Sequence, residues 1–151
     1  RVELGLVPIG SIGLSAFLAD LSWAPIAWST STALGLSEFV AQPGTARLLI
    51  DFFLMSVSGG LFIVPLYTVL QERSRRAVRS QIIAGNNIIN AGFMVLSSVL
   101  LMLLYSLPIE LTEIFLVFAL LNFAMMTYVY WSAPEFIERL LSYVRQLKHR
   151  P

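Results

Sequence analysis

Long stretches without any charged residue constrain this chain more than any other feature. Such stretches cover residues 4–19, 52–71, 80–109 and 114–134, and they hold 16, 20, 30 and 21 residues. A helix needs about 20 mostly apolar residues to cross the hydrocarbon of a bilayer. The pattern therefore predicts four membrane-spanning helices, of which the first is the shortest.

The composition supports a membrane location. Hydrophobic residues make up 57% of the 151 residues and charged residues only 13%, which leaves too little polar surface to cover a water-soluble fold. The basic residues are dispersed, which argues against a nucleic-acid surface. The chain has no cysteine, and this excludes disulfides, thiolate metal sites and cysteine nucleophiles.

The predicted architecture is all-α. We expect spans at about residues 4–23, 46–70, 81–107 and 111–131, all within one membrane domain over residues 1–133. In the loop before the second span, a short surface helix is expected near residues 34–40. Apolar residues recur at helical spacing between charged ones over residues 134–151, which predicts an amphipathic cytoplasmic tail.

Glycine and proline have two predicted roles. Gly10 and Gly13 in the first span permit close contact between helices. Gly59, Gly60 and Pro65 in the second span are expected to let that helix bend, because proline removes one backbone donor.

A basic hairpin joins the second and third spans. It contains Glu72, Arg73, Arg75, Arg76 and Arg79. Short loops rich in arginine and lysine stay in the cytoplasm, and with four spans nine of the ten basic residues, the C-terminal ones included, lie on that side. The hairpin has three open interpretations: a topology anchor, a cytoplasmic gate closed by ion pairs between Glu72 and the arginines, or a contact with anionic lipid headgroups.

Residue patterns typical of catalysis are missing. The sequence has one histidine, His149, no metal-ligand spacing, no phosphate-binding glycine loop and no nucleophile beside a base. We therefore expect no enzymatic activity, no catalytic residue, no metal site and no cofactor.

Polar side chains inside the spans are the candidate binding residues. Asn86, Asn87 and Asn90 either line a polar cavity or make hydrogen bonds between helices, and the sequence leaves both possibilities open. Asn122 is isolated and is expected to make a structural hydrogen bond. Asp51 is either a proton or ion-coupling site or a shallow interfacial residue paired with Arg47; the second reading is favoured because burial depth sets the cost of a carboxylate.

Four motifs lie close together in the middle of the chain: Gly59-Gly60, Val64-Pro65-Leu66, Gln71-Glu72-Arg73 and Gly85-Asn86-Asn87. They resemble the lysophospholipid transporter branch of the major facilitator superfamily, in particular its bacterial members fused to a phospholipid acyltransferase and an acyl-acyl-carrier-protein synthetase. The resemblance covers nearly the whole chain. It implies that the four spans are the last third of a twelve-helix fold.

The resemblance implies a carrier that moves lysophospholipids across the bacterial inner membrane by alternating access. Its partners would be membrane lipids, the lysophospholipid and an N-terminal transporter half that this chain lacks. The candidate cavity residues are then Asn86, Asn87, Asn90 and Tyr67. Two alternatives stay open: a membrane anchor for a fused acyltransferase or synthetase, and a carrier of another small solute. Because the sequence opens on Arg1 rather than methionine, we expect the native protein to be longer.

Overall fold

The structure, a computed structural model, describes residues 4–23 and 34–148. Its elements are six helices, α1 (Leu6–Ser22), α2 (Leu36–Ala41), α3 (Thr45–Arg73), α4 (Arg79–Tyr105), α5 (Leu111–Ser132) and α6 (Glu135–Lys148). The described residues contain no strand. The all-α prediction is confirmed.

Three helices, α3, α4 and α5, are long and apolar enough to cross a membrane. They contain 29, 27 and 22 residues, and at about 1.5 Å of rise per residue even the shortest spans roughly 33 Å. Their bounds fall within three residues of those expected. The first predicted span is shorter: α1 has 17 residues, a rise of about 26 Å, and does not belong with these three.

Local sequence sets the ends of the helices. Gly44 precedes α3 with φ of 91°, a left-handed conformation that glycine adopts without strain. Pro134 separates α5 from α6, and α4 ends before Pro108. The short helix expected near residues 34–40 forms as α2, where the backbone N–H of Gly35 donates to the Glu38 carboxylate at 3.0 Å. The part of that loop over residues 24–33 lies outside the described residues.

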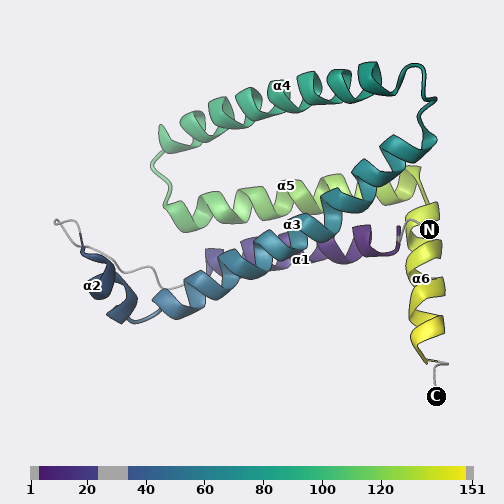
Figure 1. Ribbon diagram of the computed structural model, residues 1–151. Coiled ribbons are helices and arrows are strands. Elements are labelled where there is room, and N and C mark those ends of the chain that lie inside the picture. Colours follow the sequence, from purple (N-terminus) through teal and green to yellow (C-terminus); the bar gives the residue numbers. More distant parts are fainter. Residues whose placement is uncertain (1–3, 24–33, 149–151) are drawn as a thin grey trace.

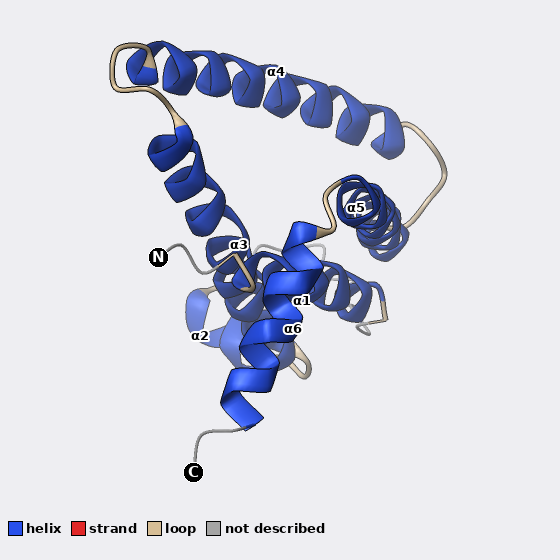
Figure 2. Ribbon diagram, turned by 90° about the vertical axis from the view of Figure 1, so that its right-hand side faces the viewer, coloured by secondary structure: helices blue, strands red, loops and turns tan. Residues whose placement is uncertain are grey.

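Helix α1 is the centre of the packing, with α3 along one side and α5 along another (Figures 1 and 2). Its contact with α3 is backbone on backbone. A Cβ atom added to Gly10 would lie 2.5 Å from the nitrogen of Phe62 and 2.6 Å from the carbonyl oxygen of Ser58. One added to Gly13 would overlap the Ser58 hydroxyl. The predicted packing role of these glycines is confirmed.

Polar side chains join α1 to α5. The amide nitrogen of Asn122 donates to the carbonyl oxygen of Ser11 at 3.1 Å and to the Ser15 hydroxyl at 2.8 Å. The Ser11 and Tyr130 hydroxyl groups are also hydrogen-bonded. Inside a membrane such bonds hold helices together, since no water competes for the amide. The structural hydrogen bond expected of Asn122 is thus present.

Helix α4 stands apart from the other long helices (Figures 1 and 2). None of its residues is buried, and large side chains such as Met94 and Met102 are 70% and 73% exposed. An apolar helix with so little of its surface covered needs lipid or further protein around it. The structure therefore displays an apolar surface that residues 4–23 and 34–148 leave uncovered.

The tail forms α6, which runs crosswise to α5 (Figure 1). Its first turn carries Glu135 and Glu138, while Ile137, Leu141 and Val144 expose apolar surface. The helix expected over residues 134–151 is present over Glu135–Lys148, and residues 149–151, with His149, lie outside the described residues.

Candidate functional site

Tyr67 on α3 and two asparagines on α4 form a polar cluster. The amide nitrogen of Asn90 donates to the Tyr67 hydroxyl oxygen at 2.9 Å, and that of Asn86 donates to the same oxygen at 3.2 Å. The two asparagines are four residues apart, so their side chains lie one above the other on one helix face. The structure thus brings together three of the four residues predicted to line a cavity.

The cluster keeps unused hydrogen-bonding capacity. A phenolic oxygen has two lone pairs and one proton, and here the asparagines occupy both lone pairs. The phenolic proton and the two amide oxygens remain for a ligand. A pocket of about 340 Å³ adjoins the cluster and is lined by Phe62, Ile63, Leu66, Tyr67, Leu70, Asn86 and Asn90. The arrangement offers a few polar groups within an apolar wall, which is how small amphiphilic ligands are commonly held.

Asn87 does not join this cluster. It is exposed, it does not line the pocket, and one residue along a helix turns a side chain by about 100° away from its neighbour. The sequence could not separate Asn87 from Asn86, because the rotation of α4 relative to α3 decides which amide meets Tyr67.

Gly59, Gly60 and Pro65 lie in different surroundings on α3. The helix continues unbroken through Gly59, Gly60 and Pro65. A Cβ atom added to Gly60 would meet nothing within 4 Å, whereas Pro65 is buried. Bending at these residues stays a prediction.

The basic hairpin differs in detail from the expected gate. Within the described residues its ion pair joins Arg73 to Glu135 on α6 at 3.5 Å, whereas Glu72 has no ion pair there. Arg79 donates to the carbonyl oxygen of Ser74 at 3.4 Å, and its Nε atom is buried without a hydrogen-bond partner among the described residues. Arg75 and Arg76 are exposed.

Arg79 and the asparagine cluster lie on a common face of α4. Asn86 and Asn90 follow Arg79 by seven and eleven residues, spacings that return to nearly the same side of a helix. At about 1.5 Å per residue, roughly 10 Å along the helix separates Arg79 from Asn86. One face of α4 therefore carries both the cationic Arg79 and the two amides that contact Tyr67.

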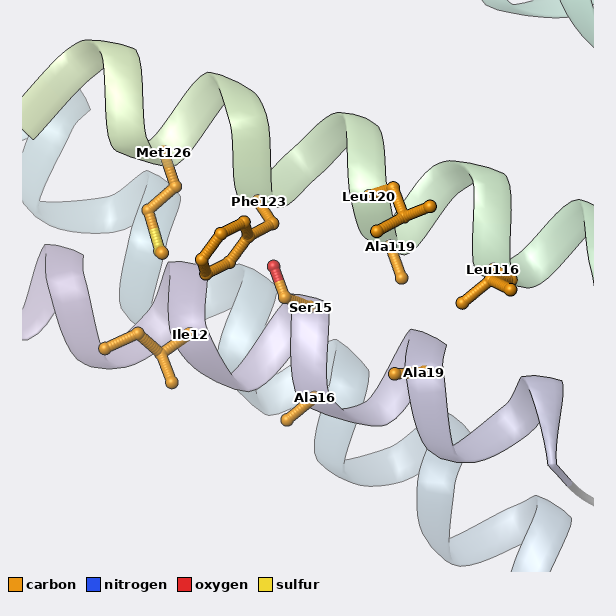
Figure 3. Close-up of a pocket in the computed structure, with 9 residues that line it drawn as sticks. All are labelled: Ile12, Ser15, Ala16, Ala19, Leu116, Ala119, Leu120, Phe123 and Met126. Carbon is orange, nitrogen blue, oxygen red and sulfur yellow. The ribbon is translucent and has the colours of Figure 1, made fainter.

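An apolar groove of about 330 Å³ lies between α1 and α5 (Figure 3). Its lining is small or apolar: Ile12, Ser15, Ala16, Ala19, Leu116, Ala119, Leu120, Phe123 and Met126. The one polar side chain, Ser15, already accepts a hydrogen bond from Asn122. This groove was not predicted from the sequence, because ordinary apolar residues from distant segments create it only when the two helices pack.

A cluster of charged residues, separate from the basic hairpin, lies where the C-terminal end of α1 meets the beginning of α3. The Arg47 guanidinium donates to both carboxylate oxygens of Asp20, at 2.6 and 3.1 Å. The predicted pairing of Arg47 with Asp51 is therefore wrong, since Arg47 reaches across to α1 instead. Asp51 is only 5% exposed, and its Oδ2 atom has no hydrogen-bond partner among the described residues.

Metal ligands do not gather in the described part of the chain, where no three histidine or carboxylate side chains lie together. No family model, no curated protein and no solved structure matches this chain. The resemblance to lysophospholipid transporters stays a prediction, and the geometry alone establishes an all-helical protein with three helices that could span a membrane.

Proposed function

We propose that this chain is the last third of a major-facilitator-type secondary transporter, and that the complete carrier moves lysophospholipids across a bacterial inner membrane by alternating access. In this proposal α1 is a fourth span, and the basic hairpin and the C-terminus face the cytoplasm. The groups that bind substrate are Tyr67, Asn86 and Asn90.

The packing of α1 supports a fourth span. This helix lies along α3 and α5, both of which are long enough to cross a membrane. A helix enclosed between two spans shares their depth in the bilayer. Its 17 residues are at the lower end of the range that spans hydrocarbon, and the exposed Trp23 just beyond its end suits the headgroup level.

The bare surface of α4 supports the existence of further transporter helices. Carriers with repeated halves bind substrate between those halves, so each half presents apolar and polar side chains to the other. The exposed apolar side chains of α4, Met94 and Met102 among them, belong to such a surface. In this proposal the missing half covers it.

The Tyr67–Asn86–Asn90 cluster is the observation that carries the proposal. Amide and hydroxyl groups in a span are costly unless they are paired, and these three keep spare capacity beside an apolar pocket. A lysophospholipid has a hydroxyl group and a phosphate that can use such donors, and one acyl chain that suits an apolar wall. Arg79 on the same face adds a cation toward the cytoplasmic end.

No covalent chemistry is needed for this function. A carrier binds its substrate in both inward-open and outward-open states, and binding shifts the population between them. The ion pair of Arg73 with Glu135 ties the hairpin to α6 in one of those states. We infer that the hairpin gates the cytoplasmic side through α6 rather than through Glu72.

Uptake of labelled lysophospholipid into vesicles that contain the complete carrier tests the proposal. We expect the double substitution Asn86→Leu with Asn90→Leu to lower uptake about tenfold, the equivalent of roughly 1.4 kcal/mol of lost binding. Asn87→Leu is the matched control, because this amide lies outside the pocket. Unchanged uptake by a normally expressed double variant would remove the cluster as the binding site.

The two alternatives make different predictions in the same assay. A membrane anchor predicts that even the unsubstituted protein gives no uptake. A carrier of another solute predicts that a drug or a sugar, rather than unlabelled lysophospholipid, competes with the labelled substrate. Competition by unlabelled lysophospholipid alone favours the proposed function over both.

A further inference from the structure

Asp51 is a buried carboxyl group that neither the packing nor the proposed binding cluster uses. It projects from the second turn of α3 and is 5% exposed. Its Oδ2 atom has no hydrogen-bond partner among the described residues. An ionised carboxylate in this position would lose its hydration with little compensation, because the nearby Arg47 is already paired with Asp20.

The charged groups around Asp51 are Asp20 from α1 and Arg47 from its own helix. Arg47 is held by both oxygens of Asp20, so its charge is already matched. Helix α2, which also contacts α3, contributes Glu38, but that carboxylate accepts a hydrogen bond from its own helix cap. One cation therefore faces two carboxyl groups, and a single bound proton makes the group neutral.

We propose that Asp51 is a proton-binding residue, and that it exchanges its proton with the side of the membrane opposite the basic hairpin. Asp20 and Arg47 are positioning residues: their mutual ion pair keeps the guanidinium away from Asp51. As a coupling site for transport, this inference rests on the proposed function. As a proton site, it stands on the geometry of α1 and α3 alone.

A proton fits this position better than a metal cation does. Hard cations take about six oxygen ligands, and within the described residues no third carboxylate approaches these two. The neighbouring guanidinium repels a cation. A proton removes the charge of Asp51 without any further ligand, as buried carboxyl groups commonly require.

Loss of the proton would act on the contact between α1 and α3. With Asp51 neutral, the two helices pack closely at Gly10 and Gly13. With Asp51 ionised, the like charges on Asp20 and Asp51 repel each other across the contact. Water is then drawn to this end of the contact, where α3 begins. The protonated state therefore favours the closed contact, and the deprotonated state favours its opening.

Infrared spectroscopy of the purified chain in detergent micelles tests the proton site, because a protonated carboxyl group absorbs apart from a carboxylate. We expect one protonated carboxyl at neutral pH in the unsubstituted chain and its loss in Asp51→Asn. Glu138→Gln, which changes an exposed acid on α6, serves as the control and should keep the band. A band that survives in Asp51→Asn, or the absence of any band in the unsubstituted chain, overturns the proposal.

A second variant tests the roles of the neighbours. Asp20→Asn releases Arg47, which then can turn to Asp51 four residues along the same helix face. We expect Asp51 to ionise and the band to disappear although Asp51 itself is unchanged. Persistence of the band would contradict the positioning role. Loss of the band when sodium replaces potassium at constant pH would overturn the proton site in favour of a cation site.

Transport measurements separate this inference from the proposed function. In vesicles with the complete carrier, Asp51→Asn should abolish accumulation driven by a pH gradient and leave exchange of labelled for unlabelled lysophospholipid intact. A protonated Asp51 in a protein that takes up no lysophospholipid would refute the proposed function alone. Uptake indifferent to pH together with an ionised Asp51 would refute the proton site alone.

Discussion

Helices α1 and α4 are opposites in sequence and in packing. Helix α4 has 27 residues and the longest uncharged interval of the chain, yet none of its residues is buried. Helix α1 has 17 residues interrupted by Pro8, Gly10 and Gly13, yet α3 and α5 both pack along it. The helix with the weakest signal for crossing a membrane thus holds the bundle together.

Partition into the membrane and packing between helices therefore follow separate rules. Hydropathy decides whether a segment enters lipid. For this purpose a Leu or Val counts equally on any face of the helix. Packing between helices in lipid depends instead on small residues that let backbones approach and on polar groups that bond across the contact. Helix α1 supplies both through Gly10, Gly13, Ser11 and Ser15, whereas the glycines of α4, Gly85 and Gly92, meet open space.

The largest effect is expected from adding one methyl group to each helix. Gly10→Ala places a Cβ against the backbone of Phe62 and Ser58, which cannot yield cheaply, so we expect a loss of about 3 kcal/mol in the free energy of unfolding. Gly92→Ala in α4 meets nothing within 4 Å and should be neutral or slightly stabilising, because alanine favours helix. Unfolding of both variants in detergent micelles measures the difference. Equal stabilities would contradict the claim that α1 is closely packed at its glycines and α4 is not.

A smaller effect is expected from the asparagines. Asn122→Leu removes two hydrogen bonds to α1 and should lower the free energy of unfolding by about 1 kcal/mol. Asn87→Leu on α4 removes an exposed amide and should change it by less than about 0.5 kcal/mol. Denaturant titrations of the two variants supply the comparison. If Asn87→Leu proves the more damaging, α4 has a partner helix within the chain that the structure does not display.

Shortening an apolar side chain gives a third comparison, in which little change is expected on α4. Met94 is 70% exposed, so Met94→Ala leaves no cavity and should alter the free energy of unfolding by less than about 0.5 kcal/mol. Ile114→Ala in α5 is the matched substitution, since this side chain is buried, and it should cost about 2 kcal/mol or more. Comparable losses for the two variants would show that α4 is packed after all.

Much of the helical layout was predictable from the sequence. Residues 46–70, 81–107 and 111–131 were expected as spans, and α3, α4 and α5 begin and end within three residues of those limits. The short helix α2 and the tail helix α6 were expected as well. These features depend on composition over about 20 neighbouring residues and on the local effect of Pro108, Pro134 and Gly44.

The candidate sites were predictable only in part. Asn86 and Asn90 were expected either to line a cavity with Tyr67 or to make hydrogen bonds between helices, and the structure places all three together through hydrogen bonds between α4 and α3. The role of Arg47 was misjudged because its partner, Asp20, is 27 residues away. A spacing of four along one helix pointed to Asp51, and only the approach of α1 offers Arg47 a second carboxylate.

The positions of the helices, and which of them are apolar enough for a membrane, follow from the amino-acid sequence, because both properties are local. Three other features became visible only in the packed helices: α1 is central, Asn86 rather than Asn87 contacts Tyr67, and an apolar groove opens between α1 and α5. These outcomes depend on how each helix is rotated about its axis and on which neighbour it meets. No pattern within a single helix encodes that choice.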